Sequence, residues 1–176
     1  MRHLIDATRQ AVAQGNWYAA LALALTMPDI CGRIAYPALK NKSQQRVVDW
    51  FEKYLAANYR SGAMGMFKSM AGGDFYALRC AFLHQGEFEV EQQRARDILN
   101  RFHMTMPGPF SMHNNFSGNM DEQGRLTNGV LQLSVDRFCE EVCAAVEVWL
   151  IDVNGDARIQ NEINALGKLA QQGTFG

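Results

Sequence analysis

The sequence predicts a mainly α-helical protein that carries a small two-stranded β-ribbon. Three observations lead to this fold class. Hydrophobic residues recur at three- and four-residue spacing in several stretches, alternate with polar residues in two short ones, and make up 48% of the 176 residues. Such a chain can close a core without disulfides, so we expect one helical domain over residues 1–176, with the ribbon and a long loop at about 102–135.

Four helices are expected in the first half, where apolar residues recur at helical spacing between capping residues. Their approximate ranges are 4–14, 17–27, 43–59 and 75–84. The second helix is apolar almost all round and should lie at the centre of the bundle. Pro28 ends it, and residues 28–41, which include Pro, Gly and Asn, form a connection.

Capping residues set these boundaries. Asn16, Ser43 and Asp74 each precede an apolar stretch and can accept a hydrogen bond from a free backbone N–H of the first turn. Gly15 and Gly86 follow the last apolar turn of two helices, where a left-handed residue commonly ends a helix.

In the second half of the chain, the spacing of the apolar residues changes from helical to alternating. Residues 102–106 and 130–135 alternate apolar and polar side chains, which predicts two short strands. Residues 107–129 between them are rich in turn-forming residues and form either a functional loop or a flexible surface hairpin. Helical spacing returns over residues 135–150, and Asp156 can cap a final helix.

The net charge is close to zero, because the chain has 17 Lys and Arg residues and 18 Asp and Glu residues. It therefore creates no overall electric field that would attract nucleic acid or a membrane. The charged residues 89–101 form either a short exposed helix at 91–100 or a solvated loop. The longest apolar stretch, 17–27, is about half the length of a membrane helix, and Asp6 argues against a secretory signal. We therefore expect a cytoplasmic protein without a membrane partner.

The four cysteines contain no Cys-x-x-Cys pair, so we expect reduced thiols. Cys139 and Cys143 lie four apart on an expected helix and either supply two metal ligands or act as small buried hydrophobes. No second closely spaced pair completes a tetrahedral site, and we predict neither a metal nor a cofactor.

A second metal motif is incomplete. Asp152, Asn154 and Asp156 fall at the first, third and fifth positions of a calcium loop. Ala157 stands where that loop needs a glycine, and Ile163 where it needs a bidentate acid. We interpret the segment as a polar turn between two helices, capped by Asp156.

The segment Arg79-Cys80-Ala81-Phe82-Leu83-His84 places an arginine five positions before a histidine near an expected helix end. With helices on both sides, it resembles the Arg-x(4 to 6)-His signature of the HEPN-like superfamily. These are small helical domains that commonly dimerise and include metal-independent ribonucleases of toxin and defence systems. The resemblance covers about the first 100 residues and implies a ribonuclease or RNA-binding protein with Arg79 and His84 as its catalytic pair.

That chemistry is physically coherent. The guanidinium of Arg79 can hold a phosphate, and the imidazole of His84 can move the proton of a ribose 2′-hydroxyl. Five positions separate the two side chains by about 140° around a helix, so one chain does not bring them together unless the helix end frays. A homodimer solves this problem by supplying a second pair, and we expect one. Cys80 departs from the family, whose active members usually have a polar residue there.

A different class of function fits the same residues. Arg79 then pairs with an acid such as Asp74, and His84 is favoured by the negative end of the helix macrodipole. Under this hypothesis the protein is a non-catalytic interaction protein. It dimerises or binds a protein partner, and its contact region includes the long loop at 107–129.

Overall fold

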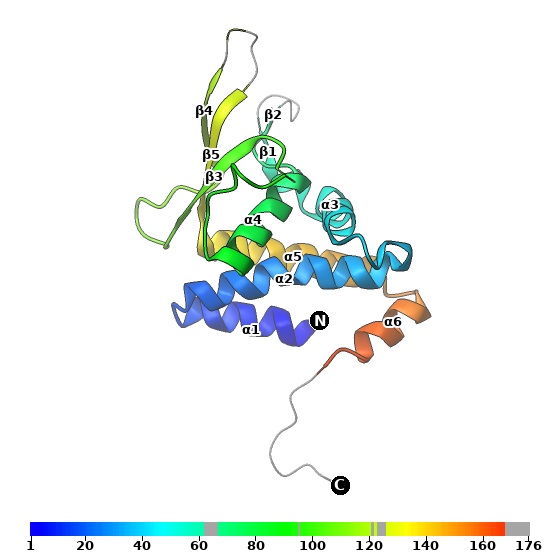
Figure 1. The fold of residues 1–176 in the computed structure, drawn as a ribbon. Helices are drawn as coiled ribbons and strands as arrows, with labels where there is room; N and C mark the ends of the chain where they lie inside the picture. Colours follow the sequence, from blue (N-terminus) through cyan, green and yellow to red (C-terminus); the bar gives the residue numbers. More distant parts are fainter. Residues whose placement is uncertain (62–66, 95, 121, 123–125, 168–176) are drawn as a thin grey trace.

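The computed structural model describes all residues except 62–66, 95, 121, 123–125 and 168–176 (Figure 1). Its α-helices are α1 (Arg2–Ala13), α2 (Trp17–Ala35), α3 (Ser43–Tyr54), α4 (Gly72–Gln85), α5 (Val135–Asp152) and α6 (Ala157–Asn164). Its strands are β1 (Arg60–Ser61), β2 (Phe67–Lys68), β3 (Leu99–Thr105), β4 (Asn115–Met120) and β5 (Leu126–Ser134). Short 3-10 turns lie at Pro37–Leu39 and Ala56–Tyr59. The prediction of a mainly helical fold with a small sheet is confirmed.

The helix α2 lies at the centre of the bundle, as its apolar sequence predicts. α1, α3 and α5 all pack against it, and α3 also packs against α4 (Figure 1). Side chains of α2 that have no exposed surface face these neighbours; they are Ala20, Ala24, Leu25, Met27 and Cys31. The remaining core is rich in aromatic side chains, among them Trp50, Phe51, Phe75, Phe138 and Trp149.

Pro28 lies inside α2, so the prediction that it ends the helix is wrong. The helix continues to Ala35, and the expected connection at 28–41 shrinks to the residues after it. A proline inside a helix costs about 3 kcal/mol through a lost hydrogen bond and a steric clash. Cys31 and Ile34 follow it at helical spacing and are fully buried, and burial of such side chains at about 1.5 to 3 kcal/mol each offsets that cost.

Strands β1 and β2 pair as a small antiparallel sheet. The larger sheet has three strands, so the prediction of a two-stranded ribbon is wrong. Its order is β3-β5-β4, with β5 parallel to β3 and antiparallel to β4. The missed strand β4 has the sequence Asn-Phe-Ser-Gly-Asn-Met, whose turn-forming residues hide a strand that pairing with β5 stabilises. Near the bundle the sheet buries Phe102, Leu131 and Leu133, while β4 and β5 extend away from the helices (Figure 1).

The helix caps predicted at Asn16, Asp156 and Gly86 are present, whereas the cap predicted at Ser43 is wrong, because α3 begins at Ser43 itself and its N-cap makes no side-chain hydrogen bond. Asn16 Oδ1 accepts the Ala19 N–H at 3.4 Å, and Asp156 Oδ1 accepts the Ile159 N–H at 3.0 Å. Gly86 ends α4 with a φ of 73°. The cap at Asp156 matches the interpretation of residues 152–156 as a polar turn between helices.

Asp74 lies within the first turn of α4, not before it, and its buried carboxylate organises two segments. It accepts four backbone N–H groups at 2.9 to 3.0 Å, from Ala71, Asp97, Ile98 and Leu99. Burial raises the pKa of this carboxyl, and the four N–H donors partly offset the rise. The described residues of 87–98 form turns and extended backbone, and β3 begins at Leu99. The alternative of a helix at 91–100 is therefore wrong, and that of a loop at 89–101 is correct only up to residue 98.

The helix α2 is also, within the described part of the chain, the one whose length and mean hydropathy of 1.2 would suffice to cross a membrane. Half of the relevant window is buried inside the protein. Core helices of ordinary globular proteins have the same character, so this feature is weak support for a membrane span.

The Asp74 contacts predict a large loss of stability on a nearly isosteric change. In Asp74→Asn, one amide oxygen can keep its N–H donors, but the NH₂ group faces the Ala71 N–H, which loses its acceptor. We expect the free energy of unfolding in urea to fall by about 2 to 4 kcal/mol. Asp49→Asn, at a side chain whose hydrogen bond is exposed, serves as the control and should change it by less than about 0.5 kcal/mol. Equal effects of the two substitutions would contradict the role of Asp74.

Candidate functional site

The two residues singled out in the sequence lie on α4 but in different surroundings. The Arg79 Nη2 donates to Asp29 Oδ2 at 2.9 Å, and its side chain is 15% exposed. His84 lies exposed in the last turn of α4. The structure therefore brings Arg79 to an acid of α2. The expected acid partner, Asp74, instead accepts hydrogen bonds from four backbone N–H groups. The prediction that Arg79 and His84 act together on RNA stays a prediction.

The Asp29 carboxylate is shared by two arginines. Its Oδ1 accepts the Arg46 Nε at 2.7 Å, while Oδ2 takes Arg79. Arg46 also donates through Nη1 to the carbonyl oxygens of Leu39 and Lys40 at 3.3 and 2.6 Å. This triad joins α2, α3 and α4, so loss of Asp29 would leave two largely buried cations without an anion. Asp29 was not singled out in the sequence, because the break predicted at Pro28 placed it outside any helix.

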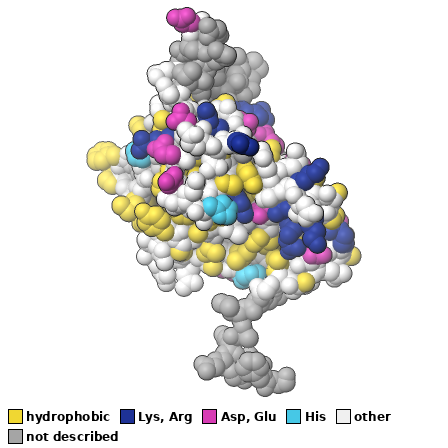
Figure 2. All heavy atoms as spheres, viewed as in Figure 1, with side chains coloured by type: hydrophobic (Ala, Val, Ile, Leu, Met, Phe, Trp, Pro, Cys, Tyr) yellow, Lys and Arg dark blue, Asp and Glu magenta, His cyan; other side chains and the backbone are white. Residues whose placement is uncertain are grey.

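A groove with an apolar lining opens where the start of α2, the end of β3 and the start of α5 meet. Its volume is about 550 Å³. We call it the apolar groove; its lining residues are Trp17, Tyr18, Leu21, Phe88, Met104, Thr105, Met106, Pro107 and Val135. None of these side chains carries a charge. Hydrophobic side chains gather on this side of the molecule, at the left of Figure 2.

The chain leaves the apolar groove as a projecting segment, residues 106–112, which we call the apolar loop. The Ser111 N–H donates to the Gly108 carbonyl oxygen at 3.0 Å and closes a turn. Pro109 and Phe110 occupy the two central positions of that turn, where proline presets the backbone. Phe110 is 93% exposed, so it stands out at the tip instead of packing on its own chain.

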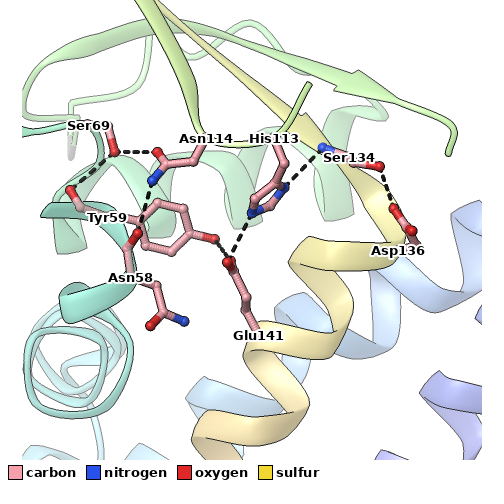
Figure 3. A network of polar contacts seen from close by, with 8 residues as sticks. All are labelled: Asn58, Tyr59, Ser69, His113, Asn114, Ser134, Asp136 and Glu141. Atoms are coloured by element: carbon pink, nitrogen blue, oxygen red, sulfur yellow. Dashed lines mark hydrogen bonds and ion pairs between the residues drawn. The ribbon is translucent and has the colours of Figure 1, made fainter. Parts of the chain in front are cut away.

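Asn114 fixes the C-terminal end of the apolar loop (Figure 3). Its Nδ2 donates to the Asn58 carbonyl oxygen at 2.9 Å, and its Oδ1 lies 2.5 Å from the Ser69 hydroxyl. Its φ of 53° lies in the left-handed region that asparagine tolerates better than most residues. The loop is thereby attached to the segments on either side of β1 and β2.

His113 adds a second attachment, to α5 (Figure 3). Its Nδ1 accepts the Ser134 N–H at 3.2 Å, and its Nε2 lies 3.0 Å from Glu141 Oε1. Since Nδ1 is an acceptor, the proton resides on Nε2 and is donated to Glu141. Both ring nitrogens are thus occupied, and His113 positions the loop.

Tyr59 completes this network. Its hydroxyl donates to Glu141 Oε2 at 2.5 Å, so one carboxylate holds both His113 and Tyr59. Burial, together with the negative charge of Glu141, raises the pKa of the Tyr59 phenol well above its ordinary value. Glu141 therefore connects α5, the turn at Ala56–Tyr59 and the base of the apolar loop.

Comparison with protein-family models, with curated proteins and with solved structures finds no match. The function must therefore be argued from the contacts and surfaces of the chain itself. The sequence predicts either a functional loop or a flexible surface hairpin at 107–129. The structure places β4 and the start of β5 there as an antiparallel hairpin, and residues 121 and 123–125 lie outside the described residues. The signal that could have identified the apolar loop is the presence of Met106, Phe110 and Met112 in a turn-rich stretch, where exposed apolar side chains are unusual.

The remaining metal candidates are buried thiols. Cys139 and Cys143 are both buried on α5, and burial raises the pKa of each, to about 12 for Cys143. Among the described residues, His, Cys, Asp and Glu form no group of three or more suited to a metal ion.

The raised pKa of Tyr59 predicts a specific dependence of stability on pH. The folded state keeps the phenolic proton that the unfolded chain loses at about pH 10, so this contribution is complete below pH 10 and declines as pH rises above it. Tyr59→Phe should be less stable than the wild type by about 1 to 3 kcal/mol at pH 8, and that difference should shrink above pH 10. Urea unfolding at stepped pH measures both. Parallel stability curves for the two proteins would show that the Tyr59 proton is not retained.

Proposed function

We propose that this protein is a non-catalytic interaction module that binds a protein surface through the apolar groove and the apolar loop. The observation that carries the proposal is the clustering of exposed apolar side chains. Six large hydrophobic side chains are exposed in the described part of the chain, and four of them belong to this site. They are Tyr18, Met106, Phe110 and Met112. Clustered exposed apolar residues of this kind commonly mark binding sites.

The way the loop is held supports binding. A closed turn at its tip and two attachments at its base fix Phe110 in an exposed position. Binding then costs little conformational entropy, because the loop need not be ordered when the partner arrives. A buried aromatic side chain surrounded by less important contacts is the usual source of affinity in protein interfaces.

The lack of charge indicates the class of partner. Nucleic acid binding depends on Lys and Arg that neutralise phosphates, and neither the apolar groove nor the apolar loop contains one. Aromatic residues and methionine are enriched in protein interfaces, while lysine and acidic residues are depleted at their centres. This surface has that composition.

A capture experiment tests this proposal. Tagged wild-type protein should retain a defined partner from a lysate of its source, and Phe110→Asp should reduce that retention about 30-fold or more, because the charge cannot enter an apolar interface. Ile151→Asp is the matched control, since Ile151 is also exposed, at 77%, but lies on α5 outside the site. A partner that Phe110→Asp retains and Ile151→Asp loses would place the interface elsewhere.

A HEPN-like RNA-binding or ribonuclease function is the second candidate, and one observation favours it. Two guanidiniums share the single carboxylate of Asp29, so one positive charge at Arg79 and Arg46 is not balanced within the triad. The Arg79 Nε is buried and has no partner among the described residues. A phosphate at the exposed 15% of the Arg79 side chain would supply the negative charge that the triad lacks, with His84 as acid or base in a dimer.

This second candidate predicts cleavage of a labelled mixed RNA in the presence of a chelator. His84→Ala should abolish that cleavage and leave the thermal midpoint within a few degrees, because His84 is exposed. His103→Ala is the control, at another exposed histidine. Wild-type protein that leaves RNA intact and does not bind it at low salt would eliminate the candidate.

A further inference from the structure

We infer that the occupant of the apolar groove is a second copy of this chain, which inserts its Phe110 there while its own groove receives the first chain's Phe110. This inference rests on the proposed function and names its partner. Each groove is then completed by a residue of the other copy.

The two halves of the contact lie next to each other on one chain. Met106 and Pro107 line the apolar groove, and Phe110 follows three residues later at the tip of the apolar loop. Because Phe110 is 93% exposed, it does not fill the groove of its own chain. In a dimer with a twofold axis this contact occurs twice. The axis places the Phe110 ring of each chain over the apolar groove of the other chain.

A single twofold interface buries both the exposed Phe110 ring and the apolar groove. A foreign partner would have to present an apolar projection and an apolar recess side by side, whereas a second copy has both by construction. The whole chain has a formal charge of −1, and the groove and loop are uncharged, so two copies do not repel one another at this surface.

The available area suits a stable pair. A standard interface buries about 800 Å² per partner. Aromatic side chains bury about 150 to 250 Å² each, so Tyr18 and Phe110 supply roughly half of this area. Met106, Met112 and the groove walls supply the remainder. The fixed position of the loop removes most of the ordering cost.

Sedimentation provides the first part of the test. The wild-type protein should have twice the 19.8 kDa mass of the chain at micromolar concentration. Phe110→Asp should raise the dissociation constant of the dimer by about 100-fold or more, and Ile151→Asp should leave it unchanged. A monomeric wild type, or a dimer that persists in Phe110→Asp, overturns the inference.

Cross-linking provides the second part and tests reciprocity. In a Cys80→Ser background that keeps Phe110 and Tyr18, a short bismaleimide should link a Ser111→Cys chain to a Thr105→Cys chain when the two are mixed, since Thr105 lines the groove, and should link either variant to itself much less. The cysteines Cys31, Cys139 and Cys143 are buried and should not react. Self-linking of Ser111→Cys at the same yield would mean that the loops meet each other, which overturns insertion into the groove.

The two proposals fail in different ways. If the wild type is a monomer but captures a lysate protein in a Phe110-dependent manner, the interaction function stands and the second copy is excluded. If it neither dimerises nor loses its partner in Phe110→Asp, both proposals are excluded.

Discussion

The burial of α2 is the constraint on which the rest of the structure depends. A 19-residue helix with apolar side chains on almost every face cannot remain beside water, so it requires neighbours all around it. α1, α3 and α5 supply them, and α4 packs on α3. The same burial carries Asp29 into the interior, where a carboxylate is tolerated only if cations and hydrogen bonds surround it. Arg46 and Arg79 meet that requirement from two other helices.

Helix positions were predictable wherever local chemistry decides them. Apolar spacing placed all the α-helices, and the caps at Asn16 and Asp156 follow from side chains that accept backbone N–H groups. Pro28 misled the prediction because proline disfavours a helix locally, whereas buried side chains beyond it stabilise that helix through tertiary packing. Strand β4 was missed because its turn-forming residues disfavour a strand locally, whereas antiparallel pairing with the next strand, β5, stabilises it.

The site was predictable only in part. The sequence singled out Arg79 but not Asp29, and an ion pair between residues 50 positions apart depends on the packing of two helices. It placed a loop after residue 106 but could not show that His113 and Asn114 fix it, because both attachments reach residues far away in the chain. Spacing alone does predict that Arg79 and His84 point in different directions, and their different environments in the structure agree with that geometry.

A polar network around His113 and Asn114 attaches the C-terminal end of the apolar loop to the rest of the protein. Without its attachments, a segment that contains Met106, Phe110 and Met112 would tend to collapse onto the nearest apolar surface, which is the groove beside it. The Glu141 carboxylate opposes such a collapse, because it binds both His113 and Tyr59 and so holds the residue that follows the loop. The polar base thus attaches the C-terminal end of the apolar loop, and Phe110 at the tip is 93% exposed. An exposed ring and a vacant groove on the same chain are each unfavourable in water, and a contact that removes both from water at once gains the free energy of both burials.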